Sequence, residues 1–177
     1  KESSAASDVY KRQEVVLVDI SINDLGVISQ SSAELSAGLT VLTGETGAGK
    51  TMVVTGLRLL AGGRADASRV RDGAKKAAVE GHFSSAKDSI RELVDSVGGE
   101  PDENGEYIVS RTVSAAGRSR AYLGGRAVPA ATLGEFAREL ITVHGQNDQM
   151  RLLAPEEQLG AVDLSLIHIS EPTRRTP

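Results

Sequence analysis

The sequence contains no cysteine and no tryptophan, and only 3% of its residues are aromatic. The lack of cysteine excludes disulfides, thiolate zinc sites and a cysteine nucleophile. With so few aromatic residues, a core has to be built from valine, leucine, isoleucine and alanine. No apolar run approaches the roughly 20 residues that a membrane helix needs, and no signal-peptide pattern opens the chain. We therefore expect a cytoplasmic protein with no membrane partner.

The 177 residues are enough for one domain of ordinary size and too few for two generous ones. Hydrophobic residues make up 40% and charged residues 25%, which is typical of a globular protein rather than of a disordered tail. The formal net charge of -4 gives no overall attraction to nucleic acid, so such binding would require a local basic patch. The 19 glycines indicate tight turns or sites lined by backbone.

Both ends of the chain are predicted not to belong to the natural protein. One choice of codons for residues 8–13 has a reverse complement that translates as Leu-Ser-Leu-Ile-His-Ile, which is the sequence of residues 164–169. A single DNA element in opposite orientations would produce both peptides, and it resembles the mosaic end used in transposase-based sequencing libraries. We therefore expect residues 1–13 and 164–177 to be translated adapter sequence without a role in the fold. Residues 14–163 are then the natural segment, cut at both ends.

Hydrophobic periodicity predicts a mixed α/β fold. β-branched or alternating residues predict strands over 15–22, 27–35, 38–43, 77–83, 106–113, 119–123 and 141–144, with a turn at 23–26. The strands over 106–113 and 119–123 are expected to form a β-hairpin. Apolar residues at helical spacing predict helices over 52–60, 86–97 and 129–140, and a last helix from Pro155. Glycine pairs follow the first two helices, as expected for helix caps.

The segment Gly44-Glu-Thr-Gly-Ala-Gly-Lys-Thr51 matches the complete P-loop (Walker A) pattern, between a predicted strand and a predicted helix. Glycines let backbone N–H groups point at phosphates, and the positive end of the following helix adds to the attraction. Lys50 can reach the β- and γ-phosphates, and the Thr51 hydroxyl can bind Mg²⁺. The sequence therefore predicts a nucleoside triphosphate site, formed by Gly44, Glu45, Thr46, Gly47, Ala48, Gly49, Lys50, Thr51 and Met52.

Nucleotide hydrolysis also needs an acidic partner for Mg²⁺, which in P-loop proteins ends an apolar strand. After residue 60, no run of four apolar residues is followed by aspartate. Asp163 follows Gly160-Ala-Val162 but lies at the tail of a predicted helix. We therefore expect the catalytic carboxylate to be missing from this chain, and the chain to be inactive in hydrolysis by itself.

Further stretches are informative when taken together with the P-loop. They are Gly38-Leu-Thr-Val-Leu-Thr-Gly-Glu-Thr-Gly-Ala-Gly-Lys-Thr51, Leu59-Leu-Ala-Gly-Gly-Arg-Ala-Asp66, Gly117-Arg-Ser-Arg-Ala-Tyr-Leu-Gly-Gly-Arg126 and Val143-His-Gly-Gln-Asn-Asp148. On these residues the chain resembles the RecN family of bacterial DNA repair proteins, which are related to the SMC ATPases. The resemblance covers essentially all of residues 14–163. The chain departs from the family at Thr51-Met52, where Ser-Ile is usual, and at Asn147-Asp148, where His-Glu is frequent; threonine keeps the hydroxyl, so the nucleotide site is not affected.

The resemblance implies the amino-terminal lobe of an ABC-type ATPase head that is split in sequence. In the family this lobe carries the Walker A loop and the Q-loop, and a long coiled coil separates it from a carboxy-terminal lobe with the signature and Walker B motifs. By position Gln146 is the Q-loop glutamine, which would approach Mg²⁺ or the attacking water and act catalytically with Lys50. On the residues alone, Gln146 could also simply cap the end of a strand.

The cofactors implied by the resemblance are ATP and Mg²⁺, with Thr51 and Gln146 at the metal. The implied partners are the missing carboxy-terminal lobe, a second head in an ATP-dependent homodimer, and DNA. ATP would lie between the two heads, so that its binding closes the dimer and its hydrolysis opens it. The implied role is double-strand break repair and recombination at the bacterial nucleoid.

Some charged residues outside the loop have two interpretations each. Arg64 corresponds to a basic position near nucleotide or DNA in related heads, or is a solvated charge beyond a helix end. The predicted hairpin is basic on an otherwise acidic lobe, so it would contact DNA phosphates or only keep a strand edge soluble. Its basic residues are Arg111, Arg118, Arg120 and Arg126. His82 and His144 have no metal-ligand spacing, and we expect them to satisfy local packing.

Two alternative functions remain open at the level of sequence. The first is a small P-loop kinase or phosphotransferase complete in one domain, although the chain shows no obvious acceptor site. The second is a nucleotide-binding interaction module of another SMC-like clamp. The combination of residues 62–66 with residues 144–146 favours the RecN family, by resemblance only.

Overall fold

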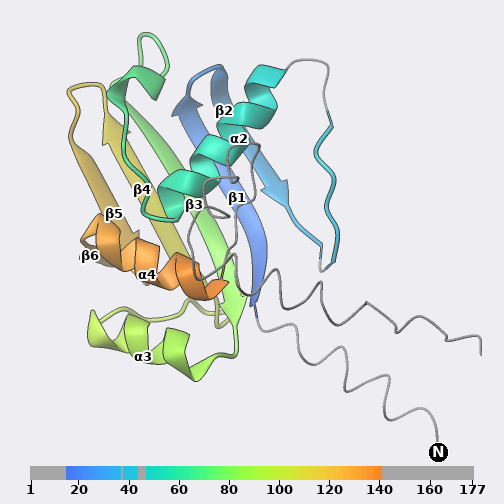
Figure 1. Cartoon of the computed structure of the whole chain (residues 1–177), viewed down its shortest axis with the longest axis vertical. Helices are drawn as coiled ribbons and strands as arrows, with labels where there is room; N and C mark the ends of the chain where they lie inside the picture. The colour runs from blue at the N-terminus through green and yellow to red at the C-terminus, as the bar shows by residue number, and fades with distance from the viewer. Residues whose placement is uncertain (1–14, 37, 44–46, 141–177) are drawn as a thin grey trace, which may run out of the picture. The chain divides into compact units, whose positions relative to one another are not determined.

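The computed structural model describes residues 15–36, 38–43 and 47–140. Its strands form one six-stranded sheet in the order β2-β1-β3-β4-β5-β6 (Figure 1). The strands are β1 (Val15–Leu25), β2 (Ile28–Glu34), β3 (Lys76–Ser85), β4 (Tyr107–Ser114), β5 (Ser119–Leu123) and β6 (Arg126–Val128). The helices are α2 (Gly47–Leu60), α3 (Asp88–Ser96) and α4 (Ala130–Leu140), with a short 3-10 turn, η1 (Ala67–Arg69). The predicted mixed α/β class is confirmed, and all neighbouring strands of this sheet pair antiparallel.

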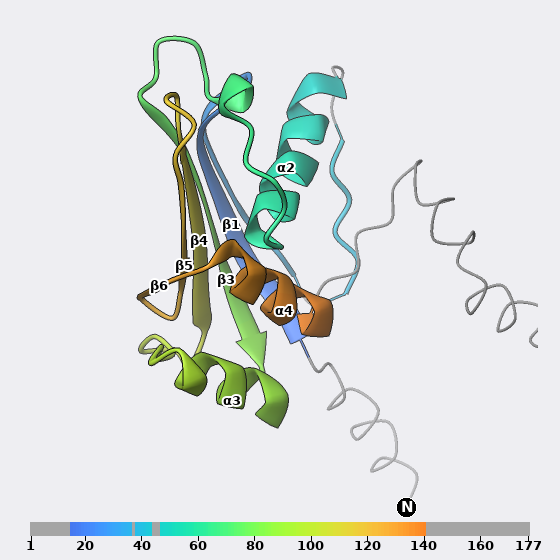
Figure 2. The same cartoon turned by 60° about the vertical axis from the view of Figure 1, so that its left-hand side comes forward.

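One face of the sheet is apolar because side chains alternate along each strand. Every second residue of β4 is buried, and β3 alternates in the same way around Val79 and Phe83. Helices α2 and α4 cover this face, as Figure 2 shows. Phe136 of α4 makes edge-to-face contacts with Phe83 and Tyr107, at ring-centroid distances of 5.6 and 6.3 Å. Such pairs contribute about 0.5–1.5 kcal/mol each beyond the area they bury.

Helix α2 ends in a Schellman motif that also brings it against α4. The N–H of Gly63 donates to the carbonyl of Arg58 at 2.8 Å, and the N–H of Gly62 donates to that of Leu59 at 3.1 Å. Gly62 has a φ of +78°, which favours glycine. A Cβ atom at Gly62 would overlap the carbonyl oxygen of Ala130 and lie 2.7 Å from the backbone nitrogen of Gly134. Glycine is therefore required twice here, by the cap and by the close approach of α4.

The observed elements match most of the predicted ones with shifted boundaries. The turn after β1 is at Gly26-Val27 rather than over 23–26, since Leu25 and Ile28 already pair. Strand β6 was not predicted; its three residues follow the Gly124-Gly125 turn and are too short to show a periodic pattern. Within the described residues, no helix is both long enough and apolar enough to span a membrane.

The prediction of a strand over 38–43 is wrong for the structure described. These residues have no regular secondary structure, and Leu39, Val41 and Leu42 are 90%, 69% and 53% exposed. A strand needs a neighbouring strand to pair with, and this segment runs beside α2 rather than along the sheet (Figure 2). The strand predicted over 141–144, the helix from Pro155 and the ends at 1–13 and 164–177 lie outside the described residues.

Candidate nucleotide-binding site

The described part of the predicted nucleotide site is the first turn of α2. Gly47-Ala-Gly-Lys-Thr51 opens this 14-residue helix, and no acidic residue lies in the first turn. The first N–H groups of a helix have no partner within it and form its positive end. No described atom lies within 4 Å of the place where a Cβ of Gly47 or Gly49 would stand. Packing does not require glycine at these positions, whereas close approach of a phosphate to the backbone would.

Thr51 holds its hydroxyl at the start of α2. Its Oγ1 donates to the carbonyl oxygen of Gly47 at 2.8 Å, which fixes the rotamer of an exposed side chain. The oxygen lone pairs are not used by this donated bond, so the oxygen can still bind a cation. A hydroxyl oxygen is a suitable ligand for Mg²⁺, which prefers hard oxygen donors. The residue therefore fits the metal role predicted for it.

Lys50 is half-buried in the same turn. An ammonium group and the positive end of a helix act in the same direction, because both stabilise a nearby anion. The first turn of α2 is thus electrostatically suited to phosphate.

Met52, which the sequence places in the predicted nucleotide-binding set, has its side chain in the core. It is 6% exposed, and a Cβ atom at Gly26 would overlap its sulfur. Met52 therefore anchors the start of α2 beneath the turn between β1 and β2. Any contact of Met52 with a nucleotide would have to come from its backbone. Gly44, Glu45, Thr46 and Gln146 lie outside the described residues.

Exposed apolar side chains flank the loop on both sides in sequence. Leu39, Val41 and Leu42 precede it, and Val54 of α2 follows it with 40% exposure. We call these four residues the apolar strip. Leu39, Val41 and Leu42 are neighbours in sequence, and neighbouring exposed apolar groups mark surfaces that bind another protein part.

The four arginines of the β4–β5–β6 region do not form one basic patch. Arg111 is buried with 3% exposure on the core face of β4, whereas Arg118 and Arg120 are exposed. Arg120 pairs with Thr112, the next residue after Arg111, so it belongs to the opposite face of the sheet. Arg126 is exposed and its Nε donates to the carbonyl oxygen of Gly98 at 2.7 Å. The predicted basic hairpin is thus wrong for Arg111, because strand alternation turns this residue inward.

Arg64 is exposed and follows the Schellman motif at the far end of α2. From Lys50 to the end of the helix at Leu60, α2 rises by about 15 Å, at 1.5 Å per residue, and Arg64 lies beyond that end. The exposure of Arg64 agrees with a solvated charge beyond a helix end, and its contact with DNA stays a prediction. Its positive charge contributes, after Ser68 and Arg69, to lowering the pKa of Asp66.

His82 lies among carboxylates rather than in the apolar core. Its Nδ1 is 3.4 Å from Asp19 Oδ2 and 3.6 Å from Glu106 Oε2, and its Nε2 is 3.8 Å from Glu80 Oε1. Ligand atoms of His82, Asp102 and Glu106 all lie within 4.8 Å of one another. The sequence does not predict this cluster, because His82 of β3 lies 20 residues or more from Asp102 and Glu106, and only the pairing of β3 with β4 brings them together. Asp102 already accepts the backbone N–H groups of Asn104 and Glu106, so the cluster has a structural role in this turn.

Comparison with known proteins agrees with the fold. Residues 19–166 match a family described as "AAA domain". The chain is 57% identical to the DNA repair protein RecN of Mycobacterium leprae, over 84% of this chain and 26% of that protein. The chain thus spans about a quarter of the length of such curated relatives.

Two solved structures share the fold. One comes from work on the ATP-driven dimerization and DNA-stimulated activation of SMC ATPases; its TM-score is 0.60 at 18% identity, covering 83% of this chain and 97% of that one. The other is the recombination mediator RecF with ATP, with a TM-score of 0.58 at 16% identity, covering 89% of this chain and 40% of that one. The expected resemblance to RecN and to SMC-like heads is confirmed, and the chain belongs to the AAA domain family.

Proposed function

We propose that the chain is the ATP-binding amino-terminal lobe of a RecN-like ATPase head that acts in DNA double-strand break repair. The observation that supports this most is the first turn of α2, where Lys50 and Thr51 stand at the positive end of a helix that opens with a complete Walker A sequence. The identity to RecN of Mycobacterium leprae supports the repair role. A self-contained kinase is not favoured, because the RecN relatives extend far beyond this chain.

Within this proposal, each described residue has a limited role. Backbone N–H groups of the first turn and the Lys50 ammonium bind phosphate oxygens. The Thr51 hydroxyl holds Mg²⁺, which would neutralise charge on the phosphates. Gln146 remains the proposed Q-loop glutamine at the metal. Hydrolysis is expected only after the signature and Walker B motifs of the rest of the protein are added.

The hydroxyl of Thr51 can be tested by its effect on the metal. We expect Thr51→Val to abolish the increase in ATP affinity that Mg²⁺ gives the wild-type chain, because valine has a similar shape but no oxygen. Thr51→Ser should keep the increase, since serine keeps the hydroxyl. Titration of a fluorescent ATP analogue with and without Mg²⁺ measures the effect. Equal Mg²⁺ dependence in the valine variant would contradict the proposed metal role.

The apolar strip and the unpaired segment 38–43 support a missing second lobe. Residues 38–43 have the composition of a strand, but no strand of the described part of the chain pairs with them. A second lobe that supplies a neighbouring strand would pair this backbone and cover Leu39, Val41 and Leu42. We therefore propose that the carboxy-terminal lobe of the same head docks here.

The same strip predicts how this chain behaves alone. Leu39→Ser combined with Val41→Ser should lower its self-association without changing its free energy of unfolding by more than about 0.5 kcal/mol, because both side chains are exposed. Val27→Ser is the matched control, since Val27 is 63% exposed but lies in the β1–β2 turn. Sedimentation velocity over a concentration series gives the result. Unchanged self-association in the double variant, or an equal decrease in the control, would contradict the proposal that the apolar strip is a docking surface.

The whole-protein proposal has a direct test in the source DNA. Amplification and sequencing downstream of the codon for Asp163 should give a long run of heptads, then a signature motif and an apolar strand that ends in Asp-Glu. A stop codon directly after the codon for Pro177 in genomic DNA would refute both the split head and the adapter interpretation of residues 164–177.

A further inference from the structure

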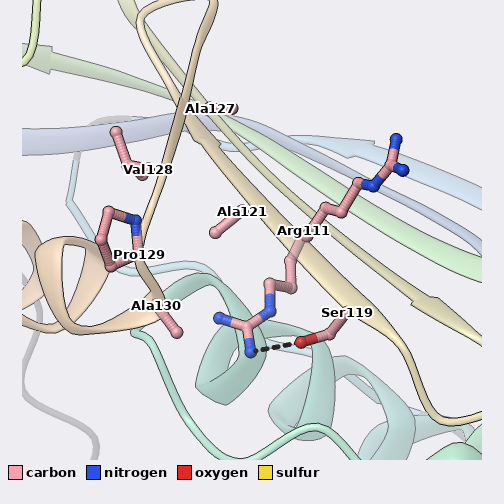
Figure 3. Close-up of a pocket in the computed structure, with 8 residues that line it drawn as sticks. Arg111, Ser119, Ala121, Ala127, Val128, Pro129 and Ala130 are labelled. Atoms are coloured by element: carbon pink, nitrogen blue, oxygen red, sulfur yellow. Dashed lines mark hydrogen bonds between the residues drawn. The ribbon is translucent and has the colours of Figure 1, made fainter.

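A hollow of about 380 Å³ opens beside the start of α4 (Figure 3). Strands β4 and β5 form its floor, and the chain from β6 into α4 forms one wall. The residues that matter for its chemistry are Arg111, Ser119, Ala121, Val128, Pro129 and Ala130. Ala121 pairs with Arg111 across the β4–β5 ladder, so a small residue leaves space next to the guanidinium. This space is large enough for a small molecular group.

The guanidinium of Arg111 is the polar centre of the hollow. Arg111 is only 3% exposed, and its Nη2 donates to Ser119 Oγ at 3.2 Å. Its Nε and Nη1 are buried and have no hydrogen-bond partner among the described residues. Burial lowers the pKa of Arg111 from its usual range, although arginine stays charged at neutral pH. Buried charges in proteins are normally paired, so we expect a hydrogen-bond acceptor to bind these two N–H donors.

The described surroundings of Arg111 offer no compensating negative charge. Among the residues that the structure describes, no acidic side chain lines the hollow, and none lies in the first turn of α4. The first turn of α4 begins at Ala130 and presents the positive end of that helix. Arg120 also lines the hollow, although strand alternation directs its side chain to the opposite face of β5. The hollow is therefore cationic with small apolar walls.

This hollow is distinct from the nucleotide site. Ala130 adjoins Gly62, just beyond the carboxyl end of α2, whereas Lys50 stands at the amino end. From Lys50 to Leu60, α2 rises by about 15 Å, and this length separates the two places.

We propose that the hollow is an oxyanion-binding site, in which Arg111 and Ser119 hold a carboxylate or phosphate group. A planar guanidinium matches the geometry of either group and forms charge-assisted hydrogen bonds with it. The Ser119 hydroxyl already orients Nη2, and it can turn to donate its own proton to the anion. The site does not depend on the proposed ATPase function.

The experiment uses the 177-residue chain with inorganic phosphate and, separately, sodium acetate as probes. Sodium chloride at equal ionic strength serves as the reference. We expect the NMR signal of the Arg111 Nε–Hε group to shift and then saturate as one of the two anions is added. The Tm should rise with the concentration of the same anion, as for any ligand of the native state. Saturation by phosphate alone identifies a phosphate site, and saturation by acetate alone identifies a carboxylate site.

Variants assign the response to the hollow. Arg111→Met should weaken anion binding by about tenfold or more, because hydrogen bonds to a charged group are lost. This variant is expected to fold, since replacing a buried charge by an apolar group of similar volume is often neutral or stabilising. Arg118→Met is the matched control and should respond like the wild type, because Arg118 is exposed and is not among the residues that line the hollow. Ser119→Ala, at an exposed position, should bind more weakly without a folding defect.

Two results would overturn the proposal. One is the absence of a saturable shift and of any Tm increase with either anion, beyond the effect of sodium chloride. The other is a response of Arg111→Met equal to that of the wild type, which would place the anion elsewhere on the protein.

Discussion

Replacing Lys50 with methionine is expected to lower the affinity of the chain for ATP by about 10- to 100-fold. Hydrogen bonds to charged groups contribute about 1.5–3 kcal/mol, and each 1.4 kcal/mol corresponds to a factor of ten in affinity. Lys50 is the basic residue of the first turn of α2, at the positive end of the helix. Methionine keeps most of the length of the side chain, so the change removes the ammonium group and little else.

Arg58→Met provides the control for this prediction. Arg58 is exposed in the last turn of the same helix. Its replacement therefore removes one positive charge from the far end of α2. Titration of a fluorescent ATP analogue in the presence of Mg²⁺ compares the three proteins, and circular dichroism verifies that each is folded. An equal loss of affinity in both variants would indicate a general effect of charge. Unchanged ATP affinity in both variants would show that α2 does not bind the nucleotide.

Local signals in the sequence were sufficient for the helices and for most of the sheet. The glycine pair after residue 60 predicted the end of α2, and the structure shows the hydrogen bonds of the cap at Gly62 and Gly63. Alternation predicted β3 and β4, where it persists as alternating burial. Helical spacing predicts a helix from Met52, directly after the Walker A sequence, and α2 begins earlier, at Gly47 within that sequence. Each of these features is determined by neighbours within a few residues.

The features that sequence did not predict depend on distant parts of the chain. Residues 38–43 have strand composition, but pairing requires a partner that the described residues do not supply. Composition alone groups Arg111 with the exposed arginines, because it does not tell which face of β4 is covered. The packing of α2 and α4 determines the covered face. The surroundings of His82 are assembled from β1, β3 and the turn before β4. Such arrangements are visible only after the sheet order is known.

Gly62→Ala is expected to destabilise the chain by about 2–5 kcal/mol. The left-handed backbone conformation costs a residue with a side chain about 1–2 kcal/mol, and forcing atoms into a packed contact adds about 1–3 kcal/mol. Both terms apply at Gly62, where φ is +78° and the backbone of Gly134 lies 2.7 Å from the position of the new Cβ atom. The overlap involves backbone of α4 rather than a flexible side chain, so a rotamer change cannot relieve it.

Gly73→Ala separates the two terms of that cost. Gly73 has a φ of +81°, but no described atom lies within 4 Å of a Cβ placed there. We therefore expect only the conformational cost of about 1–2 kcal/mol at this position. Urea denaturation of both variants gives the two free energies, and their difference measures how firmly α4 is held against the end of α2. If the two losses were equal, the close approach of α4 to Gly62 would be absent in solution. The chain that leads into α4 also forms one wall of the Arg111 hollow. If the contact is absent, Gly62→Ala should leave oxyanion binding unchanged. If α4 is held firmly against Gly62, the same substitution should weaken oxyanion binding.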